Sequence, residues 1–291
     1  MRNKSGRIRK DQTDMKRILT IQDISCIGKC SITVALPLIS AMGMETAILP
    51  TAVLSTHTMF QHFTCKDLED QIDPITDHWV SEGFHFQCIY TGYLASAQQI
   101  ELVKGVFGKF RTDDCLIVVD PAMADNGKMY AAFTPSFAQS MASLCAEADI
   151  ILPNITEASF MTSLPYRETY DEAYIIELLQ RLTGLGAKTA ILTGVGFAPG
   201  KTGVYGYDSV RDEYFYYETD RIDASYHGTG DVFASVFTGA VMNDLTWKEA
   251  VPIAADFTAR CLQATLDDPE GVNYGVNFET EIPYLLGRIG K

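Results

Sequence analysis

The chain has 291 residues, of which 47% are hydrophobic and 21% charged, and its net charge is −14 at pH 7. This composition is typical of a globular protein and excludes disorder over most of the chain. The acidic excess repels nucleic-acid phosphates and anionic lipid, although a local positive pocket is still compatible with it. No apolar run reaches the roughly 18 residues that a membrane helix needs. We therefore expect neither nucleic acid nor a membrane as a partner.

The basic side chains are unevenly distributed, and seven of the 23 lie in residues 2–17. The apolar run that follows, residues 18–21, is too short for a secretion signal. We expect residues 1–14 to form a flexible basic tail and residues 15–291 to form a single domain. The seven cysteines include no Cys-x-x-Cys pair. Free thiols, a cytoplasmic location and the absence of a zinc site are therefore expected.

Short β-rich segments alternate with longer helical segments along the chain. Alternation of this kind forms right-handed βαβ units, so we predict an α/β fold with a mostly parallel sheet covered on both faces. Ligands bind such sheets at the carboxyl ends of the strands. The predicted elements, in chain order, are strand 17–24, helix 30–42, strand 45–53, helix 67–80 broken or bent at Pro74, strand 87–91, helix 97–110, strand 115–120, helix 137–146, strand 149–152, helix 172–182, strand 188–193, a hairpin of 203–207 and 213–217, and helices near 231–242, 246–266 and 279–287.

The segment His-Gly-Thr-Gly-Asp at residues 227–231 immediately precedes a predicted helix. Gly228 and Gly230 allow the backbone to turn tightly. The free N–H groups and the positive dipole end of the helix then make an anion-binding site. In this setting Asp231 is placed to accept a proton from an alcohol. The alternative interpretation is that Asp231 only caps the helix, as Asp commonly does at this position.

Three further polar segments follow predicted strands. Asn154 and Glu157 share one face of a first helical turn, where they either form a capping box or place Glu157 on Mg²⁺ at nucleotide phosphates. Asp120 either lies on the ligand-binding rim or starts a turn before Pro121. Thr193 either touches phosphate or simply ends its strand.

The sequence does not match three other known binding or catalytic motifs. Residues 195–202 resemble a P-loop, but Val195 stands where the first glycine is required and a strand pattern follows. A dinucleotide fingerprint beginning at Gly228 has Phe233 in place of its third glycine. No Gly-x-Ser-x-Gly elbow of a hydrolase is present.

Together, the order and spacing of these segments resemble pyridoxal kinases of the ribokinase superfamily. The resemblance extends from about residue 17 to the C-terminal helices. The motifs that carry it are Gln22-Asp23, Ser55-Thr56-His57-Thr58, Thr91-Gly92-Tyr93-Leu94, Asp120-Pro121, Asn154-x-x-Glu157 and Gly228-Thr229-Gly230-Asp231.

The resemblance implies a ribokinase-like three-layer αβα sandwich with a mostly parallel central sheet, formed by residues 15–291 as one kinase domain. It implies Mg²⁺-dependent transfer of the γ-phosphoryl group of ATP to the 5′-hydroxymethyl group of pyridoxal, pyridoxamine or pyridoxine. Asp231 would be the general base, and Gly228, Thr229 and Gly230 would stabilise the transferring group. Family members are commonly homodimers, so a homodimer is expected, while a requirement for a monovalent cation stays open.

The resemblance also assigns binding residues. Those expected at ATP are Asp120, Leu152, Asn154, Glu157, Thr193, Tyr216, Tyr217, Glu218 and Thr219, and of these Asp120 and Glu157 would organise the metal. Those expected at the substrate are Asp23, Thr58, Met59 and Tyr93, together with Asp231.

Several positions depart from the family pattern and leave the substrate open. Many pyridoxal kinases have Ser at position 23, Gly-His-x-Gly-Asn where this chain has Gly-Lys-Cys-Ser-Ile at 28–32, and a smaller or polar residue at Met59. Some members carry Lys at the position of Thr193. One alternative is a kinase for hydroxymethylpyrimidine or another small alcohol, although those relatives usually have Cys where Asp231 stands. Another is a non-catalytic vitamer- or nucleotide-binding protein.

Overall fold

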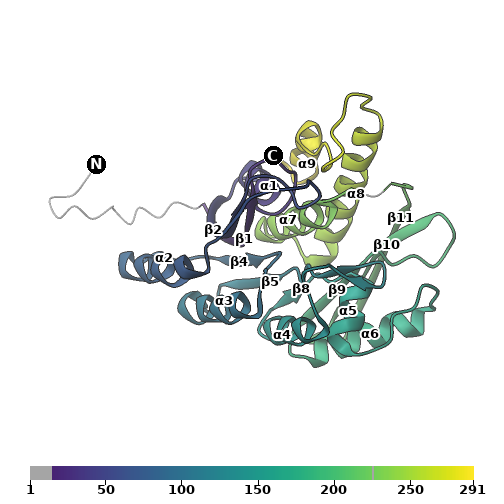
Figure 1. The fold of residues 1–291 in the computed structure, drawn as a ribbon. Coiled ribbons are helices and arrows are strands. Elements are labelled where there is room, and N and C mark those ends of the chain that lie inside the picture. Colours follow the sequence, from purple (N-terminus) through teal and green to yellow (C-terminus); the bar gives the residue numbers. More distant parts are fainter. Residues whose placement is uncertain (1–14, 225) are drawn as a thin grey trace.

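The computed structural model describes residues 15–224 and 226–291. The tail predicted for residues 1–14 lies outside the described residues, so the division into a tail and one domain stays a prediction. Within the described residues, nine strands form one sheet in the order β11-β10-β9-β8-β5-β4-β1-β2-β3. The sheet runs through the middle of the molecule, with helices above and below it (Figure 1).

Six neighbouring strands of the sheet are parallel, and the strands at its two ends are antiparallel. The parallel strands are β1 (Arg17–Ser25), β2 (Glu45–Leu54), β4 (Cys88–Thr91), β5 (Leu116–Val119), β8 (Ile150–Ile151) and β9 (Thr189–Thr193). The antiparallel neighbours are β3 (Cys65–Asp67) at one end and β10 (Lys201–Asp208) and β11 (Glu213–Asp220) at the other. A separate hairpin consists of β6 (Ala124–Asp125) and β7 (Lys128–Met129).

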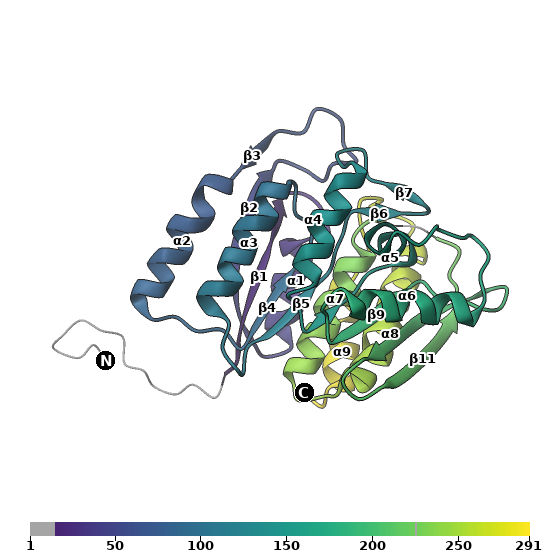
Figure 2. The same cartoon turned by 90° about the horizontal axis from the view of Figure 1, so that it is seen from below.

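The helices form two layers. One layer contains α2 (Glu69–Glu82), α3 (Ala97–Phe110), α4 (Pro135–Cys145), α5 (Ile155–Thr162) and α6 (Glu172–Gly184), which lie side by side in Figure 2. The other layer contains α1 (Ile32–Ala41), α7 (Thr229–Met242), α8 (Trp247–Leu266), the 3₁₀ turn η1 (Glu279–Glu281) and α9 (Ile282–Arg288). No helix of the described chain is both long and apolar enough to cross a membrane.

Each helix layer buries its own apolar core against one face of the sheet. Successive residues of a strand point to opposite faces, and β5 shows this directly. Ile117 and Val119 belong to the core under α3 and α4, whereas Val118 belongs to the core under α7. Because its strands are buried on both faces, the sheet reads as unbroken apolar runs in the sequence. The predicted three-layer α/β sandwich with a mostly parallel sheet is confirmed.

The structure departs from the predicted elements in a few places. The strand β3 and the β6–β7 hairpin were not predicted, because two or three residues are too few to show alternation. The helix predicted from residue 67 begins at Glu69, since the Asp67 carboxylate accepts a hydrogen bond from the Glu69 N–H at 2.6 Å. It continues through Pro74 without breaking, so the predicted break is wrong. The helix predicted over 279–287 begins as the separate turn η1.

Candidate active site

Backbone hydrogen bonds join neighbouring parallel strands at their carboxyl ends, so these ends lie side by side. The N–H groups of Gly92, Asp120, Leu152 and Thr193 donate to the carbonyls of Ile21, Thr91, Val119 and Pro153, at 3.3, 2.9, 2.9 and 3.0 Å. Residues at or just beyond these strand ends therefore share one edge of the sheet, which we call the rim. The rim carries six of the predicted site residues, namely Asp23, Tyr93, Asp120, Leu152, Asn154 and Thr193.

Asp231 lies in the first turn of α7, three residues after the residue that caps this helix. The cap is Gly228, with a φ of 83°, and among residues 15–224 and 226–291 no side chain accepts a hydrogen bond from the first N–H groups of the helix. The interpretation of Asp231 as the capping residue is therefore wrong. Its carboxyl is available for other chemistry, and the first N–H groups of α7 are available to a ligand.

The two glycines before Asp231 have different roles in the structure. A Cβ atom on Gly228 would lie 1.9 Å from the carbonyl oxygen of Lys29, so the β1–α1 loop packs directly against this turn. A Cβ atom on Gly230 would meet no atom within 4 Å. Gly228 is thus required by conformation and packing, whereas Gly230 leaves open space at the start of α7.

Ser31, which precedes α1, connects the carboxyls of Asp23 and Asp231. Its hydroxyl donates to Asp23 Oδ1 at 2.7 Å. Burial raises the pKa of Asp231 to about 7; the facing backbone N–H of Ser31 opposes this shift, and the nearby charge of Asp23 adds to it. Burial also raises the pKa of Asp23, against the hydrogen bond from Ser31. A carboxyl with a pKa near 7 suits a general base that works at neutral pH.

Asp120 and Glu157 form a buried acidic pair on the rim, with side chains 7% and 3% exposed. Glu157 Oε1 accepts from the N–H of Met123 at 3.1 Å, and Oε2 accepts from the N–H of Asn154 at 2.8 Å. Asn154 Oδ1 accepts in return from the Glu157 N–H at 2.9 Å, so the predicted capping box exists. Burial raises the pKa of both carboxyls, and repulsion from neighbouring carboxylates raises it further.

The four carboxylates of this region lack cationic partners. Among residues 15–224 and 226–291, no Lys, Arg or His forms an ion pair with Asp23, Asp120, Glu157 or Asp231. Buried carboxylates without countercharge attract a cation and repel a bare phosphate. The described residues contain no group of three or more His, Cys, Asp or Glu placed so that its members could hold one metal ion together. This donor set fits Mg²⁺, which takes one or two carboxylates and otherwise binds water and phosphate oxygens.

The loop after β2 lies beside the turn that begins α7. The ring centroids of His57 and His227 are 4.4 Å apart, and His57 Nδ1 accepts from the N–H of Met59 at 3.1 Å. Burial, more than the charge of His227, lowers the pKa of His57 to about 4, so its ring is neutral at pH 7 and can accept this bond. The two rings are tilted by 42° to one another, so the loop that carries Thr58 and Met59 lies beside the turn that contains Gly228. Met59 is 41% exposed.

Tyr93 lies just beyond β4 on the same side of the molecule. Its ring centroid is 5.5 Å from that of Phe133. Burial raises the pKa of Tyr93, and nearby Asp23 and Cys65 raise it further. Of the five predicted substrate residues, Asp23 lies near the carboxyl end of β1, Thr58 and Met59 lie in the loop between β2 and β3, and Tyr93 lies just beyond β4. These four therefore lie at the same end of the sheet.

The predicted nucleotide residues of β11 separate onto two faces of the sheet. The Tyr217 side chain faces α8, where its hydroxyl donates to Asp256 at 2.7 Å. Tyr216 packs against the α6 core instead, and its hydroxyl donates to Glu218 Oε2 at 2.9 Å. Because neighbouring residues of a strand point to opposite faces, one bound nucleotide ring cannot contact both tyrosine side chains. That both residues line the nucleotide site stays a prediction, and at least one of them would do so through its backbone.

The remaining nucleotide residues lie near the rim. Leu152 is buried at 3% exposure, so it offers a ligand its backbone and not its side chain. Asn154 pairs with Thr193 in an isolated parallel bridge. The Thr219 hydroxyl donates to the carbonyl of Thr202 at 3.4 Å.

Sequence reasoning missed two residues of this region. Ser31 gave no signal beyond its position before a helix, where Ser usually caps. Tyr130 follows the short β7 strand and is held by its N–H, which donates to the Met123 carbonyl at 2.9 Å. Burial raises the pKa of Tyr130, and the charge of Glu157 contributes most among its acidic neighbours, so the phenol lies close to the acidic rim.

Comparison with known proteins assigns the chain to a family. Residues 32–275 match the phosphomethylpyrimidine kinase family. The structure is similar to that of a Bacteroides thetaiotaomicron protein described as a “putative phosphomethylpyrimidine kinase”, with 34% identity, a TM-score of 0.92 and coverage of 95% of this chain and 96% of that one. A second crystal form of that protein, with pyridoxal, gives 35% identity and a TM-score of 0.88 over 93% and 96% of the two chains.

Pyridoxal kinases are also similar to this chain. The structure of the Lactobacillus plantarum enzyme has 28% identity and a TM-score of 0.86, covering 94% of this chain and 97% of that one. Pyridoxal kinase PdxY of Vibrio vulnificus is 26% identical over 268 residues, which are 86% of this chain and 88% of the relative.

The fold and these similarities define a kinase with the ribokinase-like architecture. The chain belongs to the phosphomethylpyrimidine kinase family. The predicted resemblance to pyridoxal kinases and the prediction of kinase activity are confirmed. The roles of individual residues stay predictions.

The two glycines allow a matched test of the turn before α7. Gly228→Ala should lower the free energy of unfolding by at least about 2 kcal/mol, because alanine is strained at this φ and its Cβ meets the Lys29 carbonyl. Gly230→Ala should change it by less than about 1 kcal/mol, because nothing occupies that space. Urea denaturation of both variants measures the difference, and equal losses would contradict the packing described above.

The raised pKa of Asp231 predicts how stability depends on pH. The carboxyl titrates near 7 in the folded protein and near 3.8 when unfolded, so its contribution to stability is full below about pH 4 and is lost as pH rises through about 7. Asp231→Asn removes this titration. The variant should therefore melt at a higher temperature than the parent at pH 8, and this advantage should vanish at pH 4. Thermal melting across this range measures it, and a pH-independent difference would contradict the shifted pKa.

Proposed function

We propose that the protein transfers the γ-phosphoryl group of ATP to the 5′-hydroxymethyl group of a vitamin B6 vitamer. The observation that carries the proposal is the carboxyl of Asp231, which has a pKa of about 7 and lies at a helix start without a side-chain cap, near the buried carboxylates of Asp23 and Asp120. The pyridoxal in the similar Bacteroides structure and the activities named for the pyridoxal kinases support this substrate class.

In the proposed reaction, Asp231 removes the proton of the vitamer's hydroxyl group while that oxygen attacks the γ-phosphorus. The new O–P bond forms as the bond between the γ-phosphorus and the β–γ bridging oxygen breaks, and ADP leaves. The N–H groups of Gly228, Thr229 and Gly230 stabilise the charge on the transferring group. Phosphoryl transfer needs alignment and charge stabilisation more than covalent help, so these groups suffice.

The acidic pair is suited to hold Mg²⁺ together with the phosphates of ATP. Within the described residues no group donates a hydrogen bond to the Asp120 carboxylate, which leaves its oxygens free for the metal. Both oxygens of Glu157 already accept backbone hydrogen bonds, so Glu157 is better suited to hold a metal-bound water. Bound Mg²⁺ would neutralise the phosphate charge that these carboxylates otherwise repel.

We assign the other nucleotide contacts to the rim. Asn154, Thr193, the backbone at Leu152 and the carboxyl end of β11 would surround ATP, with Glu218 and Thr219 beyond the level of Thr193 in the sheet. Of the two tyrosines, only Tyr217 faces the α7 layer that carries Asp231.

We assign the pyridine ring to the edge of the sheet around Asp23, Thr58, Met59 and Tyr93. Asp23 is an acceptor already oriented by Ser31. It suits a protonated ring nitrogen, a phenol or an amine, so pyridoxal, pyridoxamine and pyridoxine all stay candidates.

The second candidate function is phosphorylation of a hydroxymethylpyrimidine or another small alcohol, which the name of the matching family favours. Asp231 argues against it, since those relatives usually have Cys there. A non-catalytic binding protein is disfavoured because the base, the free amides and the acidic pair occur together at one rim. The homodimer, the cytoplasmic location and any monovalent cation stay predictions.

A substrate panel tests the proposed function. Pyridoxal, pyridoxamine, pyridoxine and hydroxymethylpyrimidine are each incubated with ATP and Mg²⁺, and ADP formation is followed by a coupled assay. We expect kcat/KM for at least one vitamer to exceed that for the pyrimidine by about 10-fold or more. Turnover of the pyrimidine alone would establish the second candidate. Ligand-induced melting shifts without ADP release would establish the binding protein.

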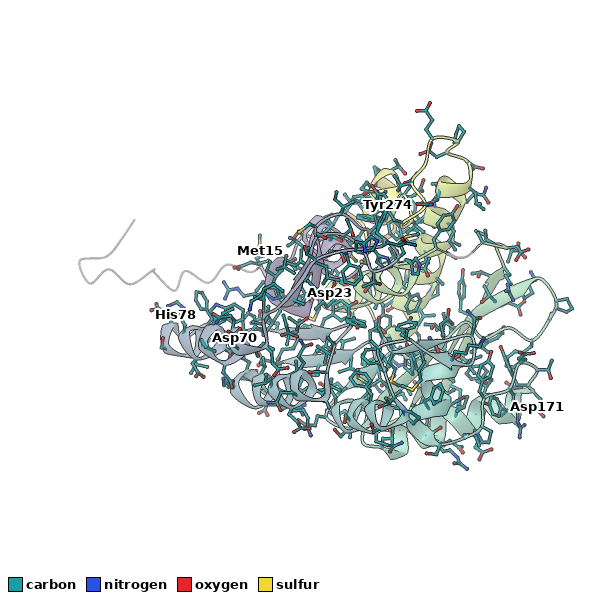
Figure 3. The ribbon with its side chains drawn as sticks, in the orientation of Figure 1. Met15, Asp23, Asp70, His78, Asp171 and Tyr274 are labelled. Carbon is teal, nitrogen blue, oxygen red and sulfur yellow. The ribbon has the colours of Figure 1, made fainter. Side chains whose placement is uncertain are left out.

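Replacing Asp231 tests its role as the base. Asp231→Asn should reduce turnover by at least about 100-fold, the scale of general-base loss. The melting shift caused by MgADP should stay unchanged, since the carboxyl acts on the alcohol. His78→Gln, at an exposed position in the second half of α2 (Figure 3), is the control and should keep full turnover. Near-normal turnover of Asp231→Asn would show that the base is another group.

A further inference from the structure

The loop between β1 and α1 is anchored to the C-terminal part of the chain by Lys29. Its Nζ donates to Asn277 Oδ1 and to Glu279 Oε2, both at 2.9 Å. The same atom lies 5.8 Å from the ring centroid of Phe278. The Lys29 side chain is only 17% exposed. One lysine thus engages three successive residues between α8 and α9.

The C-terminal segment that binds Lys29, residues 274–279, is itself held in place by hydrogen bonds to the end of α8 and to the residues that follow it. The Asn277 N–H donates to Thr265 Oγ1 at 2.8 Å, and its amide group donates to Asp268 Oδ2 at 3.0 Å. A Cβ atom on Gly275 would lie 2.3 Å from the Lys29 Cβ, so the stem of the lysine packs on the segment's backbone. The segment is attached to the end of α8, and Figure 3 marks it by Tyr274.

The opposite side of the same loop faces the candidate catalytic groups. The Lys29 carbonyl lies against Gly228, where it excludes any side chain. Two residues further on, Ser31 donates to Asp23 and faces Asp231. Lys29 therefore lies between the anion-binding turn and the C-terminal segment, while its ammonium group points away from the reacting atoms.

We propose that Lys29 is a positioning residue. It holds the β1–α1 loop, residues 26–31, in contact with Gly228 and so keeps the first turn of α7 aligned for phosphoryl transfer. This inference rests on the proposed function. The loop needs support, because Ser31 has a φ of 50°, which a residue with a side chain leaves readily. Transfer depends on alignment to a fraction of an ångström, whereas the binding residues lie on other elements. Loss of Lys29 should therefore lower kcat more than it changes KM.

Lys29→Met tests this proposal, since methionine keeps an apolar stem and removes the ammonium group. We expect kcat for the preferred vitamer to fall about 10-fold, with both KM values within about 3-fold. Lys29→Arg should restore most of the lost turnover.

Glu279→Gln changes an exposed partner of Lys29 and should lower kcat less than Lys29→Met does. Combining the two substitutions should lower kcat little further than Lys29→Met alone. Without ligands, hydrogen exchange of the amides of residues 227–231 should become faster in Lys29→Met.

Lys109→Met is the matched control. Lys109 is 24% exposed and forms two ion pairs at 2.7 Å, with Asp73 and Asp77, near the far end of α3 from the rim. It should lower the melting temperature about as much as Lys29→Met does but leave kcat and the exchange of residues 227–231 unchanged. Equal loss of kcat in both variants, or unchanged exchange in Lys29→Met, would overturn the positioning role. Failure of the parent protein to release ADP with every alcohol would overturn the proposed function, while the exchange measurement would still test the contact.

Discussion

The burial of carboxylates without countercharges is the constraint on which the rest of the site depends. Asp23, Asp120, Glu157 and Asp231 come from four different elements and meet at one end of the sheet, where the described residues supply them with no ion pair. Burial in this setting favours their neutral forms, and it gives Asp231 a pKa of about 7. The same shortage of positive charge makes the site receptive to a cation that arrives with the phosphates. The two helix layers make this possible, because their apolar cores supply the stability that such burial opposes.

Several interactions at this end serve the fold and the candidate chemistry together. The Asn154–Glu157 capping box starts α5 and also holds the Glu157 carboxylate on the rim. Gly228 caps α7 without a side chain, which leaves amides free for an anion, and it also admits the carbonyl of Lys29. Asn154, Glu157 and Gly228 therefore each have a structural role and a candidate functional role at the same time. The exception is Asp231, which occupies a capping segment yet does not cap.

The sequence predicted most of the sheet because its central strands are continuous apolar runs between helices of ordinary length. It also placed Asp120, Asn154 and Thr193 on the rim, since strand order along the chain fixes which ends are carboxyl ends. It failed where the deciding contact is distant along the chain. Ser31 is defined by its contacts with Asp23 and Asp231, and Tyr130 follows a hairpin too short to predict.

The amino-acid sequence by itself determined the α/β class, the parallel core of the sheet and the set of acidic and glycine residues at strand and helix ends, because periodicity and turn chemistry act over neighbouring residues. Only the tertiary structure decided which of these groups meet, how far burial shifts their pKa values, and that Lys29 connects the catalytic end of α7 to the C-terminal segment. Those properties depend on distances and on the exclusion of water. Both arise only when segments as far apart in the chain as Lys29 and Asn277, 248 residues, pack together.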